Sequence, residues 1–289
     1  MPHIRLCALL FLTASSLVAA DPARVADARK LQEERRLPEA RAAWEAILHE
    51  EPEHVEALFG LAITHLEAEE PKAAVAPLEK LVALHPAEAR YHRVLGDAYG
   101  LCAQEASIFS KLGLARKCIG AYDRAMELAP DDVSYRRARY DFYSMAPGMA
   151  GGGKDREDAE LAHIERLDPE QAALIRAEGF VREKKHEEAF AVLEELHRRA
   201  PENKVAVYQL GRLAAISGLR LESGAAALVD YLAHMPVPGE PPLWAAHWRL
   251  AQVLEKQGDV PQARAHYTQA LALNSACDDA RTALERLKP

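Results

Sequence analysis

Small, large and proline positions recur along this chain at a nearly constant spacing. Prolines follow amphipathic runs in six places and a serine takes that place in a seventh: Pro52, Pro86, Pro130, Pro169, Pro201, Pro236 and Ser275. Successive positions lie about 34 residues apart, or 34 plus a short insertion. A large side chain stands eight residues before each of them: Trp44, Leu78, Tyr122, Leu161, Leu193, Leu228 and Tyr267. This pattern predicts repeated pairs of antiparallel helices, with proline ending each second helix.

A small residue recurs twelve positions before most of these prolines: Ala40, Ala74, Cys118, Ala189, Gly224 and Ala263. Small residues let two helix backbones approach, while the large side chains fill the space toward the next pair. The expected repeats span residues 21–54, 55–88, 89–132, 133–171, 172–203, 204–238 and 239–276. Residues 277–289 are expected to form a terminal capping helix over the last apolar face. The fold is therefore predicted to be all-α, with seven helical hairpins and a cap.

The repeat resembles that of the tetratricopeptide repeat family. The matching stretches are "HRVLGDAY", with Leu95, Gly96 and Tyr99, and "HWRLAQVLEKQGDVPQARAHYTQALALN", with Ala251 and Ala263. The resemblance implies a right-handed α-solenoid whose concave face is lined by the first helix of each repeat. The segments "YGLCAQEASIFSKLGLARKC" and "MAPGMAGGGKD" are similar to those of exported bacterial repeat proteins, and that likeness implies no activity.

Residues 1–20 have the features of a cleavable signal peptide. Arg5 precedes an apolar run that begins near Leu6, and Val18 and Ala20 have the spacing that signal peptidase needs. A membrane anchor is the alternative, but the run is shorter than the ~20 residues of a spanning helix. We expect cleavage after Ala20 and a periplasmic or secreted protein.

Composition and charge narrow the class of partner. The chain is 49% hydrophobic and 28% charged, which is typical of a soluble globular protein. Its net charge of −8 disfavours nucleic acid, whose binding depends on neutralising phosphates. Cys102 and Cys118 fall in one repeat, so in an oxidising compartment they have two options: a disulfide, or two small buried thiols.

Two repeats depart from the regular length. The third is ten residues too long between Tyr99 and Cys118, and the fourth is five too long around residues 146–154. The fourth also has Glu157 and Tyr140 at positions where small residues are usual. We therefore expect the helix pair of the fourth repeat to be splayed or shifted.

The stretch "PGMAGGGKD", residues 147–155, matches most of a phosphate-binding pattern, G-x-x-x-x-G-K-[ST]. A working phosphate loop follows a β-strand, whereas a predicted helix precedes this one, and Asp155 replaces the hydroxyl that binds magnesium. We therefore predict an enlarged turn between two helices, with Asp155 and Asp158 capping the second. A loop of this kind is a candidate for partner contact, through Gly148, Gly151, Gly152, Gly153 and Lys154.

The remaining candidate site is the concave groove. Residues three before and one after the small residue of each first helix are expected to face it. The candidates at these positions are Phe59, Arg93, Arg137, Tyr208, Arg212 and Trp248, and Arg90, one turn before Arg93, is added to them. Rings and arginines together suit an extended peptide with acidic or apolar side chains, because arginine binds carboxylates through two hydrogen bonds. An ordinary solvated face is the alternative.

No catalytic, cofactor-binding or metal-binding motif stands out, since the sequence lacks H-E-x-x-H, C-x-x-C and G-x-S-x-G. The function predicted is a non-catalytic protein- or peptide-binding scaffold or assembly factor of the bacterial envelope. A transporter-associated carrier that encloses a small-molecule or apolar ligand in the interior of the superhelix is the second hypothesis. An enzyme that uses the loop from Gly148 to Asp155 is the third.

Overall fold

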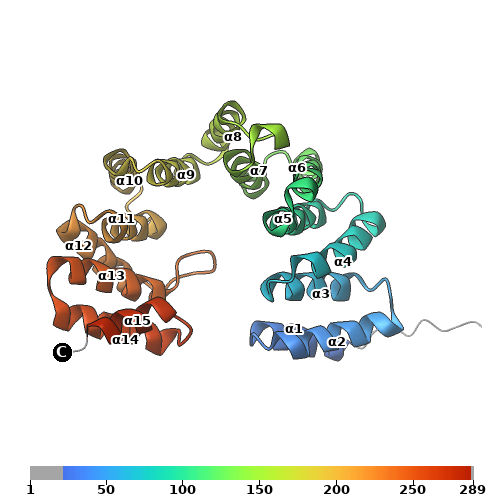
Figure 1. Cartoon of the computed structure of the whole chain (residues 1–289), viewed down its shortest axis with the longest axis horizontal. Coiled ribbons are helices and arrows are strands. Elements are labelled where there is room, and N and C mark those ends of the chain that lie inside the picture. The colour runs from blue at the N-terminus through green and yellow to red at the C-terminus, as the bar shows by residue number, and fades with distance from the viewer. Residues whose placement is uncertain (1–21, 288–289) are drawn as a thin grey trace, which may run out of the picture. The chain divides into compact units, whose positions relative to one another are not determined.

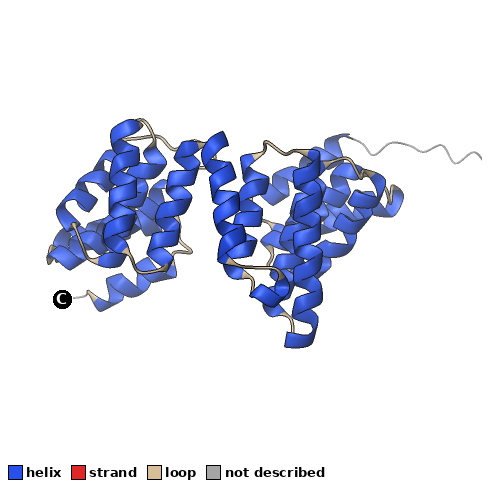
Figure 2. Cartoon of the chain, turned by 90° about the horizontal axis from the view of Figure 1, so that it is seen from above, coloured by secondary structure: helices blue, strands red, loops and turns tan. Residues whose placement is uncertain are grey.

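The structure is a computed structural model that describes residues 22–287, so the predicted signal peptide at residues 1–20 lies outside the described residues. Within the described range the secondary structure is entirely helical, with fifteen α-helices and one short 3-10 helix (Figure 2). Contacts between residues divide the chain into two compact units, and the division falls after Glu157. Each unit is described by itself.

The first unit contains three complete hairpins followed by a single helix, coloured blue to green in Figure 1. Neighbouring helices pack in chain order, each hairpin against the next. The elements are α1 (Pro22–Glu33), α2 (Leu37–Glu50), α3 (Val55–Glu67), α4 (Pro71–Leu84), α5 (Ala89–Glu105), α6 (Ile108–Leu128), α7 (Val133–Met145) and the 3-10 helix η1 (Gly148–Ala150).

The second unit also contains three complete hairpins, and a terminal helix follows them. It starts within α8, which begins in the first unit at Lys154. The last helix, α15, packs on α14, as a cap would. The elements are α8 (Lys154–Leu167), α9 (Pro169–Arg182), α10 (His186–Arg199), α11 (Lys204–Ser217), α12 (Leu221–Leu232), α13 (Leu243–Gln257), α14 (Val260–Leu273) and α15 (Asp278–Arg286).

The small and large residues of the repeat contact one another inside the hairpins. A Cβ atom at Gly96 would lie 2.4 Å from the ring of Tyr122, and one at Gly211 would lie 2.2 Å from Leu228. In these two hairpins the large side chain therefore fills space against its own first helix, whereas Trp44 of α2 reaches Gly60 of the next hairpin. Glycine is needed here because the side chain opposite occupies the volume of a Cβ.

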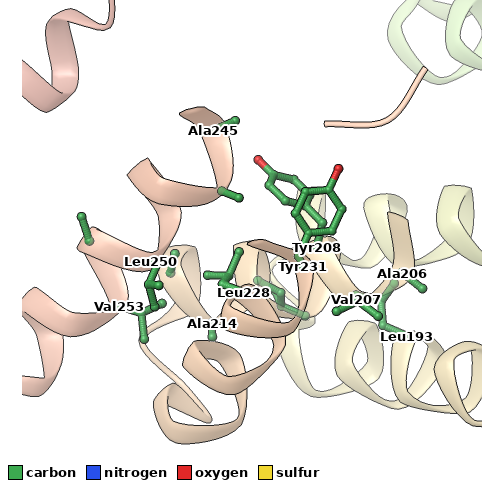
Figure 3. Close-up of a cluster of buried hydrophobic side chains, with 14 of the residues drawn as sticks. Leu193, Ala206, Val207, Tyr208, Ala214, Leu228, Tyr231, Ala245, Leu250 and Val253 are labelled. Atoms are coloured by element: carbon green, nitrogen blue, oxygen red, sulfur yellow. The ribbon is translucent and has the colours of Figure 1, made fainter. Parts of the chain in front are cut away.

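The core follows the chain as a series of clusters. In the second unit one cluster runs from Leu174 on α9 to Ala283 on α15, and Figure 3 shows part of it around Leu228 and Leu250. In the first unit Trp44 and Ile47 belong to a separate cluster near α1. Each hairpin buries its apolar face against its neighbours, as in repeat proteins generally.

The extra residues of the third repeat lengthen two helices. α5 has 17 residues and α6 has 21, whereas α3 and α4 have 13 and 14. At 1.5 Å per residue, α6 is about 10 Å longer than α4. The turn between them, at Ala106 and Ser107, is short. The insertion is therefore built as additional helical turns.

Candidate binding sites

A pocket of about 510 Å³ lies where this long hairpin meets α7 and the glycine-rich loop. Small residues make the space: Gly100, Ala103, Ala115, Ala138, Ala146 and Ala150. Larger apolar side chains from three elements complete the wall: Leu112 of α6, Phe142 and Met145 of α7, and Met149 of η1. The volume falls within the range of ligand pockets in proteins. The two irregular features of the sequence thus form one site.

One end of the pocket is polar, and its charges are internally paired. Arg93 forms an ion pair with Asp97, one helical turn later on α5. The Tyr122 hydroxyl donates to Asp97 Oδ1 at 2.7 Å. Burial raises the pKa of Tyr122 above its usual range and raises the pKa of the Cys118 thiol to about 11. Both groups are therefore neutral at physiological pH, so neither adds a charge to the pocket.

Large apolar side chains are exposed around this pocket. Met149 of η1 is 80% exposed, and Met145 at the end of α7 is also exposed. Phe109 is 93% exposed and lies one helical turn before Leu112 on α6, so the two are neighbours on the helix surface. Methionine adapts its shape to different apolar partners, and exposed apolar groups gathered at one place mark interaction sites.

The glycine-rich loop uses its own amides. The N–H groups of Gly151, Gly152 and Gly153 donate to the carbonyl oxygens of Gly148, Pro147 and Tyr143, at 3.0, 3.2 and 3.0 Å. An anion-binding loop needs such N–H groups free to point at the phosphate. A helix, α7, precedes the loop, as the sequence predicted. These features oppose a nucleotide site.

Two residues give this loop its shape. Gly151 has a φ of 98°. A Cβ atom at Gly152 would lie 1.7 Å from the carbonyl oxygen of Ala146, so no side chain fits there. One detail of the prediction was wrong: α8 begins at Lys154, so Asp155 lies in its first turn instead of capping it. Its charge still complements the positive end of the helix.

The predicted groove residues of the first unit are held by neighbours on their own face. The Arg90 guanidinium lies 4.7 Å from the centre of the Phe59 ring and 5.2 Å from that of Tyr91. Arg137 donates to Asp141 through Nε, at 2.9 and 3.0 Å to the two carboxylate oxygens. With Arg93 bound to Asp97, two of the three arginines predicted there face a carboxylate on the same helix.

Of the predicted groove residues in the second unit, one is buried and two are half-buried. Tyr208 is buried at 6% exposure, and its ring centre lies 5.3 Å from that of Tyr231 (Figure 3). Its ring therefore belongs to the core, and the expectation of an open groove residue was wrong for it. Arg212 of α11 and Trp248 of α13 are half-buried. Arg212 donates to Gln209 Oε1 at 3.2 Å.

Sequence reasoning missed Arg249, the neighbour of Trp248. Its guanidinium lies 3.8 Å from the centre of the Trp248 ring, and its Nη1 donates to Gln252 Oε1 at 2.9 Å. Apart from Arg90, the prediction considered the positions three before and one after each small residue, and Arg249 stands two before Ala251. A basic residue beside tryptophan on a predicted first helix was the available signal.

Other chemistry is sparse in the described residues. Cys102, Cys118 and Cys277 are buried free thiols, which favours the second of the two options for the first pair. No group of three or more metal-ligating side chains comes together within residues 22–287. None of the helices in that range combines the length and apolar character that crossing a bilayer requires.

Comparison with known families fits this architecture. Tetratricopeptide repeat models match residues 25–89 and, separately, residues 244–277. These matches fall in both units, on hairpins built as described above. The chain is a tetratricopeptide repeat protein. Proteins of this family are generally non-catalytic scaffolds that bind proteins or peptides.

Solved structures of other tetratricopeptide repeat proteins share the fold. One from Parabacteroides merdae ATCC 43184 has a TM-score of 0.58 at 12% identity, covering 92% of this chain and 97% of that one. A chain of the Cut9–Hcn1 hetero-tetramer of the APC/C has a TM-score of 0.53 at 16% identity, covering 95% of this chain and 50% of that one. The comparison with curated proteins gives no match. The predicted all-α solenoid of helical hairpins is thus confirmed.

Proposed function

We propose that this tetratricopeptide repeat protein is a non-catalytic scaffold or assembly factor of the bacterial cell envelope that binds a protein or peptide. The envelope location is supported by the sequence of residues 1–20 alone. The observation that carries the binding role is the apolar pocket between α5, α6, α7 and η1, with Met145, Met149 and Phe109 exposed around it.

The proposed binding mode follows from the shape of the pocket. Small residues line it and large ones stand around it, so a bulky apolar side chain of a partner fills it while the methionines close over that side chain. Buried apolar anchors of this kind contribute most of the binding energy at protein interfaces. The internally paired Arg93 and Asp97 at one end then offer a polar edge without adding net charge.

Two exposed methionines provide a matched test. Met149 is 80% exposed beside the pocket, and Met235, in the loop after α12, is 79% exposed in the second unit. Neither substitution by glutamate disturbs a core. Affinity capture from an envelope extract should recover specific partners with the wild type and with Met235→Glu. Met149→Glu should lose them, because a carboxylate at the mouth opposes apolar docking.

The result decides between specific and incidental binding. If the Met149→Glu protein captures the same partners in the same amounts as the Met235→Glu protein, the pocket is not the docking site. If no variant captures a partner above background, the scaffold proposal itself fails.

A small apolar ligand is the second candidate, because the volume of the pocket also suits one. Native mass spectrometry of protein purified from the envelope distinguishes it. A bound small molecule that is retained by Met235→Glu and lost from Met149→Glu favours this second function.

A further inference from the structure

The second unit contains a partly buried arginine for which the described residues provide no counter-ion. Arg249 makes no ion pair within 4.0 Å among residues 22–287, and its Nε is buried without a hydrogen-bond partner. Its contacts are the Trp248 ring, the Gln252 amide and the Tyr208 hydroxyl, and none of these is a carboxylate. Buried charges are normally paired, because desolvation of an unpaired one is costly.

The residues next to Arg249 add a second cation and a hydroxyl. α11 packs directly on α13, and it carries Tyr208 and Arg212 one helical turn apart. The Tyr208 hydroxyl lies beside Arg249. Arg212 also makes no ion pair among the described residues, and it bonds only the neutral amide of Gln209. Two guanidinium groups and a hydroxyl, all hydrogen-bond donors, thus gather on adjacent first helices.

The charges around Arg249 are consistent with this arrangement. Burial lowers the pKa of Arg249, and the nearby positive charge of Arg212 lowers it further. Asp279, in the first turn of α15, acts in the opposite direction without forming an ion pair. Glu178 of α9 lines the same small hollow as Arg212, so one carboxylate also lies near that guanidinium. An arginine keeps its proton through shifts of this kind, so Arg249 stays charged.

We propose that Arg249 and Arg212, with Trp248 and the Tyr208 hydroxyl, bind a carboxylate side chain of an acidic peptide segment. This inference rests on the proposed peptide-binding function and names the chemistry recognised in the second unit. The ligand carboxylate accepts hydrogen bonds from the two guanidinium groups, and an apolar part of the peptide lies against the Trp248 ring. Trp248 holds the Arg249 guanidinium in place by stacking, which favours a defined geometry of its donors.

The test uses a synthetic probe and the full chain. A fluorescein-labelled ten-residue peptide of alternating glutamate and leucine is titrated with protein at low salt, and binding is followed by fluorescence anisotropy. A peptide with glutamine in place of glutamate is the matched control. We expect the glutamate peptide to bind about tenfold more tightly, because charge-assisted hydrogen bonds to carboxylate are lost with the amide.

Substitutions test whether Arg249 and Arg212 bind the glutamate peptide. Arg249→Gln should weaken the glutamate peptide about tenfold and Arg212→Gln several-fold, because each removes a guanidinium from the carboxylate. Arg249→Lys should recover only part of the affinity, since lysine lacks the planar fork. The control is Arg198→Gln, which removes the same charge from an exposed arginine of α10 paired with Glu195. It should leave affinity within about twofold of the wild type.

Equal affinity for the two peptides overturns the proposal, and so does an Arg249→Gln protein that binds like Arg198→Gln. If Arg249→Gln fails to fold, Arg212→Gln and Arg249→Lys decide the question by the same comparison. The carboxylate site and the proposed function can fail independently. If Met149→Glu loses its partners while the two peptides bind with equal affinity, the scaffold proposal holds and only the carboxylate site is wrong.

Discussion

The two units carry different pairs of residues at equivalent places on their first helices. Positions three before and one after the small residue at the helix crossing are neighbours, one turn apart. In the first unit these are Arg93 with Asp97 on α5, and the same arginine–aspartate pair recurs on α7. In the second unit they are Tyr208 with Arg212 on α11, and Trp248 with Gln252 on α13. Arg93 and Arg137 of the first unit are therefore neutralised within their own helices, whereas Arg212 and Arg249 of the second unit bond glutamine amides.

In the two sites that we propose, one backbone plan supports two kinds of recognition. Where arginine is neutralised by its own helix, the space near it is apolar and the pocket of the first unit forms there. Where arginine has no carboxylate partner, as for Arg212 and Arg249, its charge remains available to an anion. Repeat architecture makes this possible, because each hairpin depends mainly on its neighbours for stability.

We expect the largest effect from adding a side chain to the glycine-rich loop of the first unit. Gly152→Ala places a Cβ atom against the carbonyl oxygen of Ala146, which is backbone and cannot rotate away. We expect the loop to open and the free energy of unfolding of the first unit to fall by about 3 kcal/mol. Hydrogen exchange of peptides from α5–α7, with peptides from α11–α14 as internal reference, measures it.

The matched control for that variant is Gly148→Ala, whose Cβ atom meets nothing within 4 Å. It should change exchange in α5–α7 by less than about 0.5 kcal/mol. Equal protection in the Gly152→Ala and Gly148→Ala proteins means that the loop tolerates a side chain and does not set the pocket wall.

The helical hairpins could be predicted because the interactions that specify them are local and repeat. The small and large residues recur at fixed offsets, and large residues do pack against Gly96 and Gly211. The direction was not predicted: Tyr122 and Leu228 were expected to fill space toward the next pair, and they lie instead against their own first helices. The sequence predicted extra residues in the third repeat but not that they lengthen α5 and α6. A count of extra residues does not distinguish a longer loop from added helical turns. The helix-forming character of Gln104 and Lys111 near the turn was the available signal.

The binding residues were predicted less well, because their environment depends on neighbouring repeats. Tyr208 and Arg93 both stand three residues before the small residue of their helix, yet the Tyr208 ring packs against Tyr231 of α12 in the core. A rule that uses only the position within a repeat cannot predict the contact with Tyr231. Arg249 was missed for the related reason that its position on α13 became informative only when the Trp248 ring and α11 were seen beside it.

The second prediction converts the second unit to the arrangement of the first. Gln252→Glu keeps the acceptor for Arg249 Nη1 and adds the charge that is missing. We expect the glutamate peptide to bind about tenfold more weakly, because the new carboxylate occupies the guanidinium. The melting temperature should rise, since a half-buried cation gains a partner. Gln209→Glu places the same charge beside Arg212 and is expected to have a smaller effect on peptide affinity. If the wild type and the Gln252→Glu protein bind the glutamate peptide with equal affinity, the comparison between the units is wrong.

The reverse change in the first unit is expected to have a smaller effect. Asp97→Asn keeps an acceptor for the Tyr122 hydroxyl and releases Arg93 from its ion pair. Binding of the glutamate peptide by an Arg249→Gln protein should then increase about threefold, because Arg93 becomes available at the pocket edge. Glu195→Gln, which releases the exposed Arg198 of α10, is the control and should bring no increase. A gain of the same size in both proteins would attribute it to net charge alone.

The smallest effect concerns acid sensitivity, which also differs between the units. His247 of α13 and His266 of α14 lie with their Nδ1 atoms 2.9 Å apart. Burial lowers the pKa of both imidazoles, and His266 lowers that of His247 further. Because the folded pKa values lie below the unfolded value of about 6.5, the unfolded chain binds more protons in between. Their stabilising contribution is complete above that value and is lost as pH falls toward the folded pKa values.

Carboxyl groups with lowered pKa values occur in both units, such as Glu70 in the first and Glu255 in the second, and these stay charged until pH falls well below that range. The histidine pair belongs to the second unit. Acidification from about pH 7.5 to about pH 5.5 should therefore loosen the second unit first. Limited proteolysis with fragments identified by mass should show cleavage in α13 and α14 rising over this range. His266→Gln should flatten that rise, because one proton-binding site is gone, whereas His163→Gln, on the exposed face of α8, should reproduce the wild type. An unchanged rise in the His266→Gln protein would show that the histidine pair does not set the acid sensitivity of this unit.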